Sequence, residues 1–300
     1  MFLSRGGTVE LVLIPNSVDE ISFYQEEGSK YFILGLENYC INYPSVSLEK
    51  IKELSSKYSL FISINKNIFN NELSDLKEKL LELSHLSIMG ILFYDLGVLN
   101  IVRENNIPVD LVWHQTHMVT NYNTCNFYYE KGVKFGFLAN EITLEEILEI
   151  KKRTNMKLMV ECFGYPIMSH SRRMLLTNYF KPIGKKKEDR VYHLENMNED
   201  YLLKESKDGA SILYGKLING VKPLFDLVEN NIDYAVLDMQ EVEKEIGKKV
   251  LSTYSDIIKN HSSITIKEKS SIIDEMNDLI GDNTNFFYKK TIYKVKKGDK

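Results

Sequence analysis

Short apolar runs rich in β-branched and aromatic residues recur along this chain about every 20–30 residues, and this period constrains the fold most strongly. Amphipathic segments with helical spacing separate the runs, one of them carrying Leu73, Leu76, Leu80 and Leu83. The first seven runs span residues 10–14, 31–34, 60–64, 88–93, 109–113, 134–138 and 157–160. Buried parallel strands have continuous apolar runs, and seven successive βα units are typical of a closed barrel rather than an open sheet.

An eighth strand is needed to close such a barrel, and residues 234–237, followed by Asp238, are the best candidate. A well-patterned helix over 220–231 precedes it, so residues about 165–219 are predicted to be an insertion. A chain of 300 residues with 43% apolar content can build one large core of this kind. The predicted fold class is α/β, a (β/α)8 TIM-like barrel with an insertion between strands 7 and 8 and a C-terminal helical/basic extension.

The C-terminal part of the sequence continues with helical patterns. A long helix ending near residue 260 completes the expected barrel, which therefore occupies residues 1–260. Residues 261–300 are expected to form an extension with a helix over about 267–279. The chain ends in FFYKKTIYKVKKGDK, a basic and aromatic tail that has the composition of a strand.

Composition limits the classes of protein to consider. Charged residues make up 27% of the chain and the formal net charge is −4, which argues against a uniformly basic nucleic-acid binder. The three cysteines, Cys40, Cys125 and Cys162, are odd in number and widely spaced, so we expect reduced thiols in a cytoplasmic protein. The N-terminal segment has no signal-peptide pattern, and no apolar run reaches about 18 residues, so no membrane association is expected.

Polar side chains follow most of the predicted strands. Because barrel proteins carry their functional groups at the carboxyl ends of the strands, these side chains are expected to meet at one mouth. The residues are Asn65, Asp95, His114, Thr116, Asn140, Glu141, Glu161 and Asp238. Asp95, His114, Glu141 and Glu161 have the chemistry for acid–base work. The alternative role for each is structural, because loops after strands often end in a residue that caps the next helix.

A histidine pair and an arginine pair could also carry chemistry. His114 and His117 are three residues apart, but no third ligand lies nearby, so no metal site is predicted. Beyond Glu161, Gly164 turns the chain toward Arg172 and Arg173, with Tyr179 and Phe180 close behind. Arginines beside aromatic residues can hold phosphates and stack bases, although a solvated helix start would have the same sequence.

Several short motifs occur in an order and spacing that identify a family. They are Gly35-Leu36, Asn65, Asp95-Leu96-Gly97, the stretch from His114 to Asn121, Leu138-Ala139-x-Glu141, Glu161-x-Phe163-Gly164, Ser171-x-Arg173 and the unit from Gly209 to Asp238. Over about residues 9–260, and again in the basic tail, the chain resembles the peptidase U-32 family, the collagenase-like proteins. It is most similar to short members that occur beside a longer paralogue in low-GC Gram-positive bacteria.

The resemblance implies a function and partners. Paired short and long members resemble the proteins that make 5-hydroxyuridine at the tRNA wobble position, with prephenate implicated as a substrate. It therefore implies a component of wobble-uridine 5-hydroxylation that acts with a longer paralogue and with tRNA. Alternatives are a collagenase-like peptidase, for which the sequence has no nucleophile–base or metal constellation, and a catalytically degenerate barrel with a scaffolding role.

The strand-end residues and the family motifs together give the candidate site. The candidate pocket residues are Asn65, Asp95, His114, Thr116, Asn121, Glu141, Glu161, Gly164, Ser171, Arg173 and Asp238. The candidate nucleic-acid contacts are the basic residues Arg172, Arg173, Lys289 and Lys290, with Lys294, Lys296 and Lys297 further along the tail.

The chain departs from the family pattern at several charged or metal-binding positions. Family members often hold an iron–sulfur cluster on four cysteines, but two of those positions are Ile167 and Met174 here, so no cofactor is predicted. Cys162 is out of register with that motif. Asn140 and Phe163 replace a usual arginine and histidine, and Val236-Leu237-Asp238-Met239-Gln240 replaces Lys-Ile-Glu-Gly-Arg. Few fixed positive groups are therefore expected at the mouth.

Overall fold

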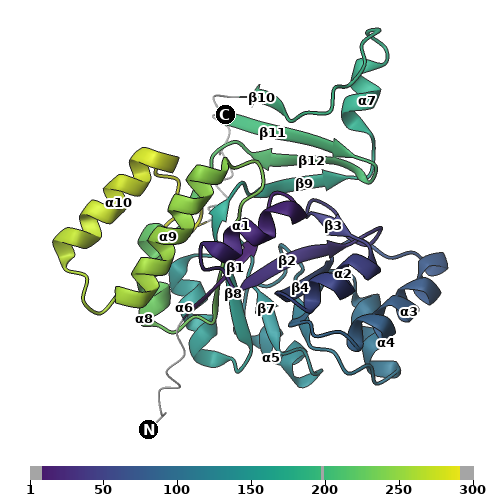
Figure 1. Ribbon diagram of the computed structural model, residues 1–300, viewed down its shortest axis with the longest axis horizontal. Helices are drawn as coiled ribbons and strands as arrows, with labels where there is room; N and C mark the ends of the chain where they lie inside the picture. The colour runs from purple at the N-terminus through teal and green to yellow at the C-terminus, as the bar shows by residue number, and fades with distance from the viewer. Residues whose placement is uncertain (1–8, 197–198, 291–300) are drawn as a thin grey trace, which may run out of the picture.

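Eight parallel strands close into a barrel in the computed structural model, which describes residues 9–196 and 199–290 (Figure 1). The strands are β1 (Glu10–Ile14), β2 (Tyr31–Leu36), β4 (Ser59–Ile64), β5 (Gly90–Phe93), β6 (Leu111–Trp113), β7 (Phe135–Phe137), β8 (Lys157–Gly164) and β14 (Tyr234–Asp238). Pairing of β1 with both β14 and β2 closes the sheet. The predicted TIM-like barrel is confirmed, with each strand within a few residues of its predicted position.

Alternation along the strands divides the apolar residues between two cores. Side chains that point inward form one cluster, in which Phe61 packs edge-on against Phe135 and Tyr234 with ring centroids 5.9 Å apart in each pair. Their neighbours along each strand point outward, where Phe32 and Leu60 join a larger cluster with the helices. Because successive side chains of a strand lie on opposite faces, a strand buried on both faces needs a continuous apolar run.

Helices surround the barrel and are fixed at their ends by local sequence. They are α1 (Ile21–Glu26), α2 (Leu48–Ser55), α3 (Leu73–Ser84), α4 (Leu96–Glu104), α5 (Tyr122–Glu130), α6 (Leu144–Arg153), α8 (Val221–Glu229), α9 (Lys244–Asn260) and α10 (Ile266–Ile280). Thr143 begins α6 with a capping box, since its hydroxyl accepts from the Glu146 amide at 3.3 Å while Glu146 accepts from the Thr143 amide at 2.7 Å. No helix within the described residues is both long and apolar enough to cross a membrane.

The insertion between β8 and β14 contains a second sheet that the sequence reading did not predict. Its elements are β9 (Ile167–Ser171), α7 (Leu175–Phe180), β10 (Tyr192–Asn196), β11 (Glu199–Ser206) and β12 (Gly209–Tyr214), with the short β13 (Ile218–Asn219) returning to pair with β8. The strands are antiparallel in the order β10-β11-β12-β9. Because this sheet is only half-buried, its strands mix polar and apolar residues and resemble a polar loop in sequence.

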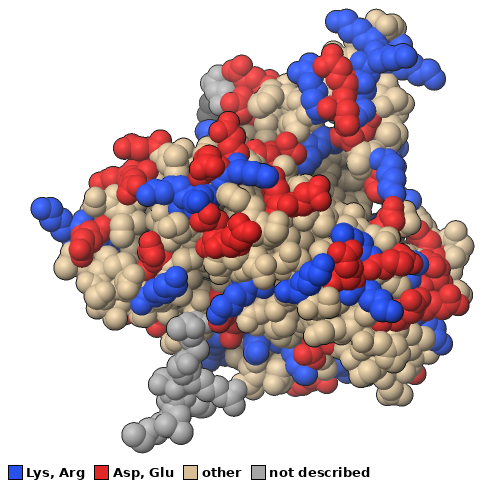
Figure 2. Space-filling view, in the orientation of Figure 1, with Lys and Arg blue, Asp and Glu red and all other residues tan. Residues whose placement is uncertain are grey.

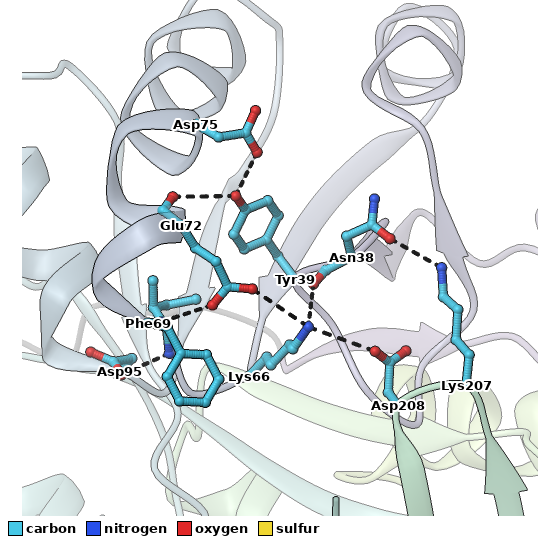
Figure 3. Close-up of polar contacts among 10 residues, drawn as sticks. Asn38, Tyr39, Lys66, Phe69, Glu72, Asp75, Asp95, Lys207 and Asp208 are labelled. Atoms are coloured by element: carbon cyan, nitrogen blue, oxygen red, sulfur yellow. Dashed lines mark hydrogen bonds and ion pairs between the residues drawn. The ribbon is translucent and has the colours of Figure 1, made fainter.

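Polar contacts fix the inserted sheet against the loops that follow β2 and β4 (Figure 3). The Lys66 ammonium donates to the Asn38 carbonyl at 3.0 Å and lies 3.7 Å from the Asp208 carboxylate in the β11–β12 turn. Lys207 from the same turn donates to the Asn38 amide oxygen at 3.1 Å. Asn38 has a φ of 68°, a left-handed conformation that asparagine tolerates better than most residues. The sheet is thereby held over the carboxyl ends of the barrel strands.

The C-terminal segment after α10 folds back along the mouth of the barrel. The Asn219 amide donates to the Asn283 carbonyl at 2.7 Å, and the Leu144 amide donates to the Phe287 carbonyl at 2.9 Å. Asn285 donates from its side chain to the Asn140 carbonyl at 3.0 Å. The prediction of a strand-like tail is wrong for residues 286–290, which form a turn against the barrel, and residues 291–300 lie outside the described residues.

Candidate functional site

A cavity of about 270 Å³ opens at the carboxyl ends of the barrel strands. The barrel contributes six residues that the sequence placed at the mouth, namely His114, Thr116, Asn140, Glu141, Glu161 and Asp238. The inserted sheet covers the cavity with Pro166, Ile167, Met168 and Tyr214, and the C-terminal segment closes one side with Asn283, Asn285, Phe286 and Lys289. Three parts of the chain that are distant in sequence therefore build one site.

Two carboxyl groups lie at the base of this cavity on the paired strands β8 and β14. Glu161 accepts a hydrogen bond from the Asn140 side-chain amide at 2.6 Å, and Asp238 accepts from the Gln240 backbone amide at 3.0 Å. Burial, together with the Asp238 charge, raises the pKa of Glu161 to about 8, and burial raises the pKa of Asp238 to about 6. Near pH 7 the site therefore offers a protonated Glu161 as a donor and an ionised Asp238 as an acceptor.

Aromatic rings form the wall beside the carboxyl pair. The His114 ring stacks on Phe137, with centroids 4.4 Å apart and planes within 14°, and Tyr43 lies parallel to it at 6.3 Å. His114 is only 6% exposed, and burial lowers the pKa of its imidazole to about 4, so the ring is neutral at pH 7. Its Nδ1 has no hydrogen-bond partner among the described residues, which leaves that atom unsatisfied. Burial and the Glu161 charge raise the pKa of Tyr43 well above its ordinary value.

Tyr43 was missed by the sequence analysis because it does not follow a strand directly. It belongs to the loop between β2 and the short strand β3 (Ser45–Val46), which pairs with the end of β2. Asn140 was noted as a replacement for a family arginine, and its bond to Glu161 shows what the shorter side chain does here. No sequence signal distinguishes Tyr43 from the other tyrosines of the chain.

A second cavity of about 340 Å³ adjoins the first and shares part of its lining with it. Tyr43, His114 and Thr116 line both cavities, as do Ile167 and Met168 of β9. The residues that line only the second cavity are mostly polar or charged. They include Asn42, Asn65, Lys66, His170, Arg172 and Asp208.

Several predicted pocket residues have structural roles instead. Asp95 lines neither cavity, because its carboxylate caps α4 by accepting from the Gly97 amide at 2.7 Å and also accepts from the Ile68 amide. Asn121 caps α5 by accepting from the Thr124 amide at 2.9 Å. Asn65 reaches the rim of the second cavity while it exchanges hydrogen bonds with the Ile41 backbone at 2.7 and 3.0 Å. Capping, the alternative given for the strand-end residues, therefore accounts for Asp95, and Asn121, which came from the family motifs, is a helix cap as well.

The remaining predicted residues lie along the insertion and the tail. Gly164 ends β8 directly beside Asp238, and the Ser171 hydroxyl accepts from the Arg173 amide at 3.2 Å. The Arg173 side chain is exposed and outside both cavities. Among the predicted nucleic-acid contacts, Arg172 lines the second cavity, Lys289 lines the first, and Lys290 lies 3.9 Å from Glu145.

The residues present do not fit an iron–sulfur cluster. Cys40, Cys125 and Cys162 are buried on three separate elements, and residues 9–196 and 199–290 contain no group of three His, Cys, Asp or Glu that could hold a metal. Ile167 lies on β9 at the rim of the cavity, where its side chain offers no ligand.

Iron analysis tests this conclusion directly. Protein purified without oxygen is expected to be colourless and to contain far less than one iron or sulfide per chain, because thiolates that hold such clusters are missing from the site. Metal analysis and an absorption spectrum provide the measurement. Stoichiometric iron that survives replacement of all three cysteines by serine would mean that another ligand set exists.

A serine–histidine contact occurs in the insertion, but its serine is closed to a substrate. His170 Nδ1 lies 2.8 Å from the Ser211 hydroxyl, and that hydroxyl donates to the Asn42 side-chain oxygen at 2.6 Å. Ser211 is only 2% exposed and lines neither cavity. A nucleophile has to reach the substrate, so this contact supports the packing of β9 and β12 and not hydrolysis.

The barrel and its mouth define an α/β-barrel protein whose ligand site lies at the carboxyl ends of the strands. Residues 19–295 match peptidase family U32, and the chain belongs to this family.

Relatives in this family are named for tRNA hydroxylation. tRNA hydroxylation protein P2 of Bacillus subtilis (strain 168) is 26% identical over 307 residues, which cover 95% of this chain and 99% of that protein. Protein P1 of the same strain is 24% identical, covering 57% of this chain and 42% of P1. tRNA hydroxylation protein P of Haemophilus influenzae is 23% identical, covering 51% of this chain and 33% of that protein. Of these three relatives, P2 is similar from end to end, whereas P1 and P align with about half of this chain.

Proposed function

We propose that this chain is a component of tRNA hydroxylation at the wobble uridine and that it acts with a longer family member. The observation that carries the proposal is the match to tRNA hydroxylation protein P2 over nearly the full length of both chains. One Bacillus strain has both P2 and the protein P1, less than half of which aligns with this chain, and this supports a pairing of short and long forms.

The chemistry of the mouth supports a flat, neutral ligand such as a uracil ring. A protonated Glu161 can donate to a ring carbonyl while an ionised Asp238 accepts from the adjacent ring N–H. The neutral His114 ring, stacked on Phe137, supplies a flat wall for the base. We propose that the cavity receives the uridine base in this way.

An anion such as prephenate is poorly matched to the first cavity. Glu141, Glu161 and Asp238 bring three carboxyl groups to its lining, whereas Lys289 is the one lysine among its described lining residues, which include no arginine. Bringing a dianion beside an ionised Asp238 costs free energy unless further cations compensate it. We propose that the longer family member supplies those cations, which explains why the short chain would need a partner.

The other functions fit the site less well. A peptidase needs an activated nucleophile or a metal-bound water, and Ser211 beside His170 is buried and lines neither cavity. A purely scaffolding barrel has no use for a buried Asp238 beside a half-buried Glu161 at its mouth, because desolvating carboxyl groups without a strong partner costs stability. Strongly shifted carboxyl groups in a cavity instead favour a site that handles protons or binds a ligand.

Nucleosides from a deletion strain test the proposed function. Mass spectrometry of digested tRNA is expected to show loss of the hydroxylated uridine, and the wild-type gene should restore it. Asp238→Asn should restore at most about a tenth of the modification rate, because a lost hydrogen bond to a charged group is worth roughly 1.5–3 kcal/mol. The matched control is Glu130→Gln, the same loss of charge at an exposed position of α5. Unchanged hydroxyuridine in the deletion strain would refute the proposal.

A further inference from the structure

Positive charge is concentrated in one segment of an otherwise acidic chain. Residues 172–190, named here the basic arm, contain seven lysines and arginines and two acidic residues. The basic residues are Arg172, Arg173, Lys181, Lys185, Lys186, Lys187 and Arg190. The basic arm thus has a formal charge of +5, although the whole chain has −4. Such a local concentration attracts a polyanion even when the protein as a whole is acidic.

The basic arm extends away from the barrel at the far end of the inserted sheet (Figure 1). It contains α7, and the space-filling view shows a cluster of lysines and arginines at this tip (Figure 2). Lys181, Lys185 and Lys186 are exposed, and in the described part of the chain none of them is within ion-pair distance of an acidic group. Most other clusters in the same view alternate in sign, so this surface differs from the rest of that face.

The basic arm is fixed to the sheet rather than suspended from it. The Glu205 carboxylate on β11 accepts from the Leu176 amide at 2.8 Å and from the Thr177 amide at 3.2 Å. Lys187 donates to the Glu205 carbonyl at 3.3 Å, and Phe180 packs against Tyr192 with ring centroids 5.3 Å apart. Anchoring at both ends of α7 holds the exposed lysines in a defined position, which lowers the entropy lost on binding.

Apolar side chains are exposed among these lysines. Tyr179 is 66% exposed and Ile183 is 53% exposed. Closer to the barrel, the Arg172 guanidinium stacks over the ring of Phe69 at 4.2 Å and lines the second cavity. Cations interleaved with exposed rings are the pattern by which proteins hold single-stranded nucleic acid, through phosphate contacts and base stacking.

We propose that the basic arm binds the single-stranded loop of an RNA, with lysines on phosphates and Tyr179 stacked on a base, so that a neighbouring nucleotide reaches the mouth. This inference rests on the proposed function for the identity of the RNA. An acidic protein is the less favoured partner, because lysine is depleted in the buried centres of protein interfaces. Arg172 and the second cavity connect the arm to the mouth, since that cavity shares His114 and Tyr43 with the first.

Binding of a synthetic anticodon stem–loop RNA with uridine at the wobble position tests the proposal. The full chain is compared with a variant carrying Lys181→Glu, Lys185→Glu and Lys186→Glu. The matched control carries Lys30→Glu, Lys77→Glu and Lys267→Glu, three exposed lysines on other elements, so the change in net charge is the same. Thermal melting establishes that both variants are folded.

The arm variant is expected to bind the RNA at least about tenfold more weakly, and the control is expected to stay within about twofold of the wild type. The slope of log Kd against log salt should fall by about 2, because each phosphate contact on a single strand contributes about 0.7. Tyr179→Ala should weaken binding several-fold and leave this slope unchanged, since stacking releases no counterions.

Three outcomes would overturn the proposal. The first is equal weakening by the arm and control variants, which would reduce the effect to net charge. The second is unchanged RNA binding by the arm variant, with or without loss of its binding to a longer family member, which would make the arm a protein interface or an inert tip. The third is equal binding of a blunt RNA duplex and the stem–loop. Nucleoside analysis of the deletion strain tests the proposed function separately from this inference. The basic arm can bind RNA even if the chain has no role in wobble hydroxylation, and the chain can have that role even if the arm does not bind RNA.

Discussion

Replacing Gly164 with alanine is expected to lower the free energy of unfolding by about 4 kcal/mol, the sum of backbone strain and overpacking. Gly164 has a φ of 132°, which residues with a Cβ rarely adopt. An added Cβ would lie 2.6 Å from the Cβ of Asp238 and 3.0 Å from its carbonyl oxygen. The end of β8 must therefore move away from β14, or the new residue must remain strained.

Gly28→Ala is the matched control for this substitution. Gly28 has a φ of 99°, but an added Cβ would meet nothing within 4 Å, so its cost of about 1–2 kcal/mol comes from the backbone alone. Urea unfolding of the two variants separates the clash from the strain. Equal losses in both would show that β8 and β14 can separate freely at the mouth. A larger loss of stability in Gly164→Ala would show that the added Cβ presses on Asp238. Because Asp238 belongs to the candidate site, we expect this substitution to damage the site together with the fold.

Replacing Glu161 with glutamine is expected to stabilise the protein at pH 8 by roughly 2–3 kcal/mol and to have little effect near pH 4.5. The folded pKa of Glu161 is about 8, whereas an unfolded glutamate titrates near 4.3. Between these values the folded state binds more protons than the unfolded state, so stability falls as the pH rises through this range. Glutamine cannot ionise and escapes this loss, while its side-chain oxygen can still accept from Asn140.

Urea unfolding of both proteins from pH 4.5 to 8.5 measures the difference. Glu130→Gln, at an exposed position, should show a difference that changes little across the same range. The full pKa shift of Glu161 corresponds to a larger difference in stability than the roughly 2–3 kcal/mol expected here. We expect the smaller difference because Glu161 is only half-buried and its charge is coupled to that of Asp238. A difference that does not grow with pH would contradict a protonated Glu161 in the folded protein.

The barrel strands could be predicted because their signal is local. A strand buried on both faces must be a continuous apolar run, and this requirement leaves its mark within five or six residues, as in Glu10–Ile14 and Ser59–Ile64. The same locality placed His114, Glu161 and Asp238 at strand ends, where barrel geometry brings them to one mouth. Helix caps are local too, and for this reason capping was a sound alternative for Asp95.

Only the tertiary structure decided what surrounds those strand ends. The half-buried sheet of the insertion has a mixed polar and apolar sequence, and its cover over the mouth depends on contacts such as Lys66 with Asp208, far apart in the chain. Tyr43 and the segment at Asn283–Lys289 complete the cavity from positions that no periodicity distinguishes. The proton on Glu161 likewise follows from burial beside Asp238, because a pKa depends on neighbours in space and sequence order does not set them.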